Sequence, residues 1–403
     1  MGLFGVNWDD VRDQFELRKD YIHIATSMFI SSHPRLVREK IEKHRKELDQ
    51  DPTKYLEVNE IDYGNDVRKR IANYFGVKDP NDIALTSSAT MGHGIIYNGL
   101  KLNKGQEILC SEHNHYSHQE SILRATDRTG ATYREIPIYK RINTVTEDEI
   151  ITSLLKEITE KTKVLAITWV HSDTGLKSPV AKIAKEISVI NKSREEENKI
   201  LLIVDGVHGF GIETETFEEL GCDFFITSTH KWVFGPRGTG FVAGTKEAWK
   251  HVSPVIPSYR IMNQVSKQFE HPAEMDGVQM TPGGFHAHEH RWALPVAFDF
   301  VDSIGKKHIY NRVHDLNKQC KEGLADIPNV SLHTPMDTHL SAGITSFEIN
   351  GLKSKDVVNK LLKKKIIATV APYYSEYTRL TPGIINTPEE VDIVLDVIRS
   401  IAK

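Results

Sequence analysis

Two short stretches, LLIVDGVHG (Leu201–Gly209) and FITSTHKW (Phe225–Trp232), decide how this chain folds. The first is an apolar run of strand length that ends in an acid and a histidine. The second is an apolar run that ends in Lys231. Continuous apolar runs are typical of strands buried on both faces, so both stretches are predicted inside a parallel sheet. Asp205 and Lys231 would then lie together at the carboxyl edge of that sheet, where ligands bind in such folds.

The same alternation of apolar runs and helical patterns continues along most of the chain. Further strands are predicted at 83–86, 107–110, 164–168 and 239–243. Helices are predicted to begin near residue 34 and to cover 66–75 and 88–100. Strands separated by helices favour an α/β fold with a mostly parallel sheet covered on both faces.

The pattern changes after residue 292. A long helix from Trp292 to Leu324 is followed by short strands and two more helices, which predicts a smaller α+β domain. We therefore expect an N-terminal arm over 1–32, a large domain over 33–292 and a small C-terminal domain over 293–403.

Composition excludes several classes of protein. The formal net charge of −4 offers no basic surface for nucleic acid, and the apolar runs are too short for a membrane helix. The charged stretch 7–13 lacks the apolar segment of a secretory signal. The three cysteines lie far apart and form no CxxC pair, so a disulfide framework is not expected. Together these features predict a cytoplasmic protein.

Three features at predicted strand ends carry chemistry. Ser88-Ala89-Thr90 follows a strand and opens a helix, whose free N–H groups can hold a phosphate. Asp205 is a buried acid that needs a cationic partner. Lys231 could react with an aldehyde. Each feature alone has an ordinary explanation: a helix cap, a salt bridge or a surface ammonium. Together they fit pyridoxal 5′-phosphate (PLP), whose phosphate, ring nitrogen and aldehyde need these three groups.

The order and spacing of further motifs resemble the class V aminotransferases, a family of fold-type I PLP enzymes, in their isopenicillin-N-epimerase-like branch. The resemblance extends from about residue 20 to the end of the chain. It rests on the motifs SAT (88–90), EH (112–113), SDTG (172–175), DGVH (205–208), STHK (228–231), GPRGTG (235–240) and Arg379 within YTRL (377–380).

The resemblance implies a role for the residues around the cofactor ring. Lys231 would bind the cofactor aldehyde and later move the Cα proton of the substrate. Asp205 would pair with the ring nitrogen and keep it protonated. His208 would bond the phenolic oxygen, His113 would stack on the ring, and Ser172 occupies a position where relatives often carry Asn.

The resemblance also implies how the phosphate and the substrate are bound. The phosphate would be held by Ala89, Thr90, Ser228 and His230, and the substrate carboxylate by Arg379. Thr281 lies where a segment of the neighbouring subunit reaches the phosphate in relatives. This implies a homodimer with shared active sites, acting on a small amino-acid-type substrate.

The reaction type is less defined than the cofactor. Cysteine desulfurases of the family carry a catalytic cysteine on a loop before the carboxylate arginine, and the corresponding stretch 370–377 has none. We therefore expect deprotonation at Cα leading to transamination or epimerisation, with C–S lysis by β-elimination as the alternative. His115, Tyr97, His288, Tyr373 and Tyr374 are the candidates for pocket groups that select between these outcomes.

Histidine clusters suggest a rival class of function. HNHYSH (113–118) and HAHEH (286–290) space histidines as in metal sites, which would suit a metal-dependent hydrolase. That hypothesis leaves the arrangement of Asp205 and Lys231 unexplained. We expect no metal in the active site.

Overall fold

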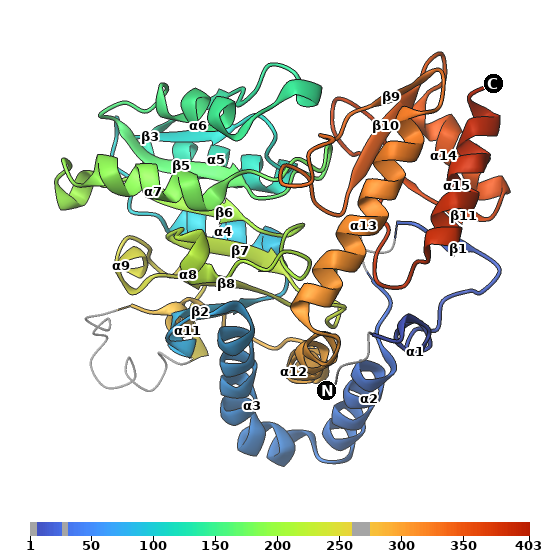
Figure 1. Ribbon diagram of the computed structural model, residues 1–403. Coiled ribbons are helices and arrows are strands. Elements are labelled where there is room, and N and C mark those ends of the chain that lie inside the picture. Colours follow the sequence, from blue (N-terminus) through green and yellow to red (C-terminus); the bar gives the residue numbers. More distant parts are fainter. Residues whose placement is uncertain (1–5, 26–30, 260–274) are drawn as a thin grey trace, which may run out of the picture.

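The computed structural model describes residues 6–25, 31–259 and 275–403. The predicted N-terminal arm, 1–32, and the predicted large domain, 33–292, therefore include stretches that lie outside the described residues, namely 1–5, 26–30 and 260–274. Figure 1 shows the C-terminal part of the chain, in orange and red, beside a larger sheet-containing part.

A seven-stranded mixed sheet forms the centre of the large part. Its spatial order is β2 (Ile83–Thr86), β8 (Gly240–Gly244), β7 (Phe224–Ser228), β6 (Leu201–Asp205), β5 (Thr162–Thr168), β3 (Glu107–Ser111) and β4 (Thr132–Ile136). Strand β8 runs antiparallel to both neighbours, and the other pairs are parallel. The predicted α/β fold with a mostly parallel sheet is confirmed.

Helices cover both faces of this sheet, as the continuous apolar strands require. Alternate residues of a strand enter different cores. Leu202 and Val204 of β6 pack in a core with α3 (Pro52–Phe75) and α7 (Val180–Asn191), whereas Leu201 and Ile203 face α4 (Ala89–Gly99) and α5 (Tyr116–Thr129). A strand buried on both faces gains hydrophobic stabilisation from each of its residues.

The C-terminal part has a core of its own around a small antiparallel sheet. The sheet order is β12 (Thr369–Val370), β13 (Thr378–Leu380), β10 (Thr345–Ile349) and β9 (Val330–Leu332). Helices α14 (Ser354–Lys363) and α15 (Pro388–Ile401) pack on it. The N-terminal strand β1 (Ile22–His23) pairs in parallel with β11 (Ile366–Ile367), so the arm is joined to this part of the fold.

The helix predicted over 292–324 is two helices in the structure, so that prediction is wrong at one point. Helix α12 (His288–Ile304) ends at Gly305, and α13 (Lys306–Ala325) begins after it. Gly305 has a φ of 94°, a backbone conformation that residues with a Cβ rarely adopt. The expected domain boundary at 292/293 falls inside α12, which packs beside α2 (Arg35–Gln50) and α3.

The helices in the described ranges share one further property. None of them is both long enough and apolar enough to cross a membrane.

Helix α4, whose N-terminus borders the site, packs closely on the sheet at Gly92, and this packing can be tested. At Gly92 an added Cβ would lie 2.7 Å from Ile226 Cγ2, whereas nothing lies within 4 Å of the corresponding position at Gly94. Gly92→Ala should lower the free energy of unfolding by about 1–3 kcal/mol, because α4 must move off the sheet. Gly94→Ala should raise it by about 0.5–1 kcal/mol through helix propensity.

The measurement is urea unfolding of the two variants without cofactor. Equal effects of the two substitutions would contradict close packing of α4 on β7.

Candidate active site

A cavity of about 150 Å³ opens at the carboxyl ends of β6 and β7. Asp205 ends β6, and Lys231 follows β7 by three residues, so the parallel pairing of the two strands brings them to one place. The cavity is lined by eight of the residues predicted from sequence: Ala89, Thr90, Ser172, Asp205, His208, Ser228, His230 and Lys231. His113, Thr281 and Arg379 are not among its lining residues.

Lys231 is the reactive amine of the cavity. Burial lowers the pKa of Lys231 to about 8, although the negative charge of Asp205 opposes the fall. Its Nζ lies 3.0 Å from Nε2 of His208. Burial and then the charge of Lys231 lower the pKa of His208 well below its ordinary value, so its imidazole is neutral. A minor fraction of Lys231, roughly a tenth at pH 7, is therefore uncharged, far more than for a lysine of ordinary pKa.

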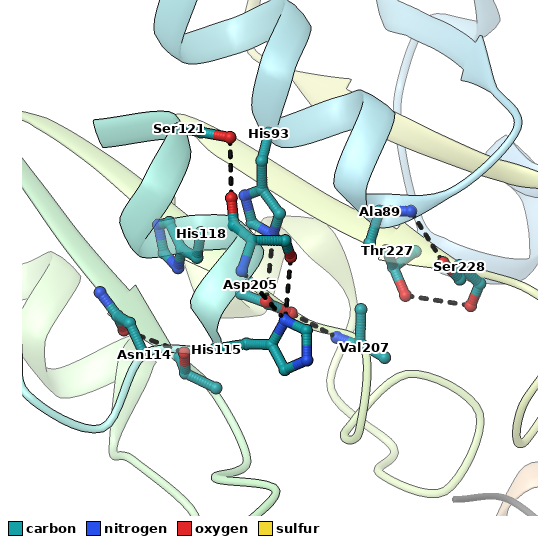
Figure 2. A network of polar contacts seen from close by, with 12 residues as sticks. Ala89, His93, Asn114, His115, His118, Ser121, Asp205, Val207, Thr227 and Ser228 are labelled. Carbon is teal, nitrogen blue, oxygen red and sulfur yellow. Dashed lines mark hydrogen bonds and ion pairs between the residues drawn. The ribbon is translucent and has the colours of Figure 1, made fainter. Parts of the chain in front are cut away.

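Asp205 stays ionised although it is buried. Burial by itself would raise the pKa of Asp205, but bonds to the carboxylate hold it below its ordinary value. His93 Nε2 lies 3.0 Å from Oδ2, and the backbone N–H of Val207 donates to Oδ1 at 3.0 Å. Figure 2 shows Val207 and His93 converging on the carboxylate from different elements.

A second layer of rings stands behind His93. The rings of His93 and His118 stack with their centroids 4.4 Å apart, and His118 Nε2 bonds the hydroxyl of Tyr97 at 2.6 Å. The sequence analysis gave His93 no role, placed His118 in the histidine cluster 113–118 that suggested a metal, and placed Tyr97 among the pocket candidates. The available signal was that His93 and Tyr97 are four residues apart on the helix that begins at the phosphate motif.

The N-terminus of α4 forms the phosphate end of the cavity. Ser88 caps the helix by accepting from the N–H of Met91, and the N–H of Ala89 donates to Ser228 Oγ at 2.8 Å. Thr90 and His230 line the same wall. A helix N-terminus with hydroxyl groups beside it favours an anion such as a phosphate.

Arg379 lies behind the cavity wall. Three of its five N–H donors bond Ser172 O at 2.6 Å, Val370 O at 3.0 Å and Thr369 Oγ1 at 3.3 Å. Burial lowers the pKa of Arg379 to about 10, so the guanidinium is charged at neutral pH. The hydroxyls of Ser172 and Tyr373, which both line the cavity, hydrogen-bond each other. The other two N–H donors of Arg379 have no hydrogen-bond partner among the described residues.

His113 does not line the cavity, although the expected stacking on the cofactor ring would place it there. It packs between Tyr139 and His171, with ring centroids 4.7 and 5.0 Å away, and its Nδ1 lies 3.4 Å from Asp173 Oδ2. His115, two residues further, lines the cavity instead. The turn from Glu112 to His115 between β3 and α5 decides which histidine points inward, and a motif match alone cannot specify this.

Thr281 makes its hydrogen bonds within its own chain. Its hydroxyl accepts from the N–H of Leu85 at 3.0 Å and from Arg68 at 2.9 Å, and donates to Gly277 O at 3.1 Å. It borders a different pocket, of about 580 Å³, which Tyr259 also lines. The expected homodimer remains a prediction.

The cavity residues fit PLP by their chemistry. An ionised acid, an amine of lowered pKa and a helix N-terminus surround one small space, and these match the ring nitrogen, aldehyde and phosphate of the cofactor. Nδ1 of His208 is buried beside the cavity with no hydrogen-bond partner among the described residues. Such an atom is satisfied when a polar ligand binds.

Comparison with known proteins agrees with this chemistry. The model of the family described as aminotransferase class V matches residues 39–392. The chain belongs to this family. It is therefore a PLP-dependent enzyme of the class V aminotransferase family, and PLP is its cofactor.

Curated relatives of this class V enzyme differ in reaction. Isopenicillin N epimerase from Streptomyces clavuligerus is 26% identical over 97% of each chain. A probable cysteine desulfurase from Halalkalibacterium halodurans is 27% identical over 73% of this chain and 68% of the relative.

Solved structures share the fold. The complex between the cystine C–S lyase C-DES and its reaction product cysteine persulfide has a TM-score of 0.83 at 21% identity, covering 95% of this chain and 97% of that one. The cysteine desulfurase from Thermococcus onnurineus NA1 in its apo form has a TM-score of 0.83 at 20% identity, covering 100% and 99%.

The lowered pKa of Lys231 predicts how the protein without cofactor captures PLP. Only the uncharged amine attacks an aldehyde. The rate of PLP capture should therefore rise with pH and reach half of its maximum at about pH 8. The rate is followed by the visible absorbance of the lysine-bound cofactor. Asp205→Asn should lower the midpoint, because it removes a charge that favours the ammonium form. A midpoint near 10, the ordinary lysine value, would contradict the burial of Lys231.

Proposed function

We propose that this enzyme cleaves a C–S bond of a cysteine-type amino acid by β-elimination, starting from deprotonation at Cα. This was the alternative to transamination or epimerisation in the sequence analysis. Several curated relatives are described as cysteine desulfurases or probable cysteine desulfurases, which favours sulfur amino acids as substrates. The observation that carries the proposal is that Tyr373, and no thiol, projects from the loop 371–377 into the cavity.

The cysteines of this chain cannot accept sulfur in the way a desulfurase requires. Cys110, Cys222 and Cys320 are free and buried. Burial raises the pKa of Cys110 and of Cys320 to about 12, and that of Cys222 also lies far above its ordinary value. Because the thiolate is the nucleophile, none of them is poised to take sulfur from a substrate. Sulfur removed from a substrate would therefore leave as a small molecule.

Three residues of the chain would have separate roles in the elimination. PLP, when bound, stabilises negative charge at the Cα of an amino acid attached to it. Lys231 has the pKa of a base that can remove the Cα proton near neutral pH. Asp205 stays ionised and can hold a proton on the ring nitrogen. His208, 3.0 Å from Nζ, orients the lysine.

Substrate groups would meet Ser172 and Tyr373 in the cavity wall, and Arg379 lies behind Ser172, bonded to its carbonyl. Arg379 offers two free donors for the carboxylate. Burial raises the pKa of Tyr373, so its hydroxyl keeps its proton and can donate to the departing sulfur. His115 also lines the cavity, with its ring centroid 6.2 Å from that of Tyr373, and would take the ring-stacking role first expected of His113.

Epimerisation is the second candidate. It is supported by the isopenicillin N epimerase that aligns over 97% of both chains. Two proton-transfer groups are needed for it, and Lys231 and His115 both line the cavity. Transamination would use Lys231 alone.

Two further properties belong to this proposal. A homodimer would bring the segment 281–284 of one subunit toward the phosphate of the other, and the neighbouring Tyr259 and Phe285 are exposed apolar groups that a second subunit could cover. The free, buried cysteines fit a reducing compartment, in support of a cytoplasmic location.

Product analysis separates the three reactions. The PLP-loaded enzyme is incubated in D2O with L-cystine, S-methyl-L-cysteine and L-alanine. We expect pyruvate and ammonia from both sulfur substrates, together with cysteine persulfide from L-cystine and methanethiol from S-methyl-L-cysteine. A deuterated D-enantiomer without pyruvate would contradict β-elimination and show epimerisation. A keto acid that retains sulfur would contradict it and show transamination. Lys231→Ala is the control and should abolish each product.

Arg379 supplies a second test. Arg379→Ala should raise KM by about 10- to 100-fold, because a charged hydrogen bond of about 1.5–3 kcal/mol is lost. The KM of Arg379→Lys should lie between those of the parent enzyme and of Arg379→Ala, because lysine keeps the positive charge but cannot bind a carboxylate through two parallel N–H groups. Steady-state kinetics gives both values, and near-UV circular dichroism checks that the bonds of Arg379 to Ser172 and Val370 were not essential for folding. An unchanged KM in both variants would mean that another group binds the carboxylate.

A further inference from the structure

We propose that His113, His171 and Asp173 form a binding site for a divalent transition-metal ion next to the PLP cavity. The site is separate from the chemistry proposed above and does not depend on which reaction the enzyme performs. One ligand atom of each residue lies within 4.8 Å of the other two. The three residues come from two loops, one after β3 and one after β5.

The spacing of His113 and Asp173 suits a shared ion better than a direct hydrogen bond. Nδ1 of His113 lies 3.4 Å from Oδ2 of Asp173, beyond the usual N–H···O range of roughly 2.7–3.2 Å. Ligands about 2.0–2.1 Å from a tetrahedral ion are about 3.3–3.4 Å apart. The pair thus already has the separation of two ligands of one ion.

His171 presents a buried lone pair. Its side chain is fully buried, and its Nε2 lies 3.3 Å from Ser178 Oγ. Ser178 gives its own proton to Thr168 O at 2.8 Å, so it accepts from the Nε2–H of His171. Nδ1 is then the unprotonated nitrogen, and it has no partner among the described residues. A buried acceptor without a partner is costly, and a metal ion would satisfy it.

Neighbouring groups border the three ligands. Tyr139 stacks on the ring of His113, and Oε1 of Glu112 lies 3.6 Å from its Nε2, which is too long for a hydrogen bond. Oδ1 of Asp173 accepts from the N–H of Thr174 at 2.8 Å. Metal-binding histidines typically give their second nitrogen to an acceptor, as Nε2 of His171 does to Ser178 Oγ at 3.3 Å.

Two imidazoles and one carboxylate select the class of ion. This donor set suits Zn²⁺, Co²⁺ or Fe²⁺ and not Mg²⁺ or Ca²⁺, which prefer oxygen ligands. A fourth position would be left for water. Since Asp173 adjoins Ser172, whose carbonyl accepts from Arg379, a bound ion would also fix the wall behind the substrate.

A second group of similar composition, His93, His118 and Asp205, does not carry the same inference. Asp205 is bonded to His93 at 3.0 Å and is required for the cofactor ring. When PLP is bound during the test, the carboxylate of Asp205 is occupied by the ring nitrogen and is not free to bind a metal ion.

The test is a Co²⁺ titration of the chelator-treated, PLP-loaded enzyme. We expect one ion per chain by equilibrium dialysis and the visible absorption of four-coordinate Co²⁺, with Zn²⁺ displacing it. Asp173→Asn and His171→Gln should each weaken binding at least about 10-fold. His333→Gln is the control, because His333 also pairs with a carboxylate, 2.6 Å away, and stacks on a tyrosine, but belongs to no three-ligand group among the described residues.

Folding of the variants is checked by the absorbance of bound PLP and by circular dichroism. If His171→Gln does not fold, His113→Gln, at a half-buried position, replaces it. No bound ion in the parent enzyme would overturn the proposal. So would binding that survives the Asp173 and histidine substitutions.

Discussion

Most of the structure around the cavity serves to keep Asp205 ionised and the amine of Lys231 partly uncharged in one buried space. A lone buried carboxylate is expensive, and here a histidine and a backbone N–H bond it directly. The parallel strands β6 and β7 bring the acid and the lysine together at their carboxyl ends. The apolar cores on both faces of the sheet exclude the water that would otherwise restore the ordinary pKa of each group.

The C-terminal part of the fold completes this site. Arg379 lies on β13, where it pairs with Ser346 of β10 and Thr369 of β12. Its guanidinium bonds the carbonyl of Ser172 in the large part, and Ser346 Oγ donates to the carbonyl of Asp173. The small sheet is therefore held against the loop after β5 by bonds to main-chain atoms. A movement of the C-terminal part would shift the wall where a substrate carboxylate is expected.

Sequence reasoning predicted the parts of the site that depend on strand ends. Asp205, Ser228 and Lys231 follow directly from apolar runs and their terminal residues, and the structure gathers them around one cavity. The choice between His113 and His115 depended on the path of a four-residue turn, and the role of His93 on how α4 packs on the sheet. Helix α12 ends because Gly305 adopts a positive φ, a conformation that the helical pattern around it does not reveal. Thr281, expected to reach the phosphate of a neighbouring subunit, bonds Leu85, Arg68 and Gly277 of its own chain.

The most direct test of the central claim is to reduce the PLP-loaded enzyme with borohydride and to map the modified lysine by mass spectrometry. Lys321 provides an internal comparison, because burial also lowers its pKa to about 8 while its Nζ bonds Pro335 O, Met336 O and Ser341 Oγ away from the cavity. The account predicts one pyridoxyl group per chain, on Lys231. Modification of Lys321 or of any other lysine in its place would contradict the assignment of this cavity as the cofactor site.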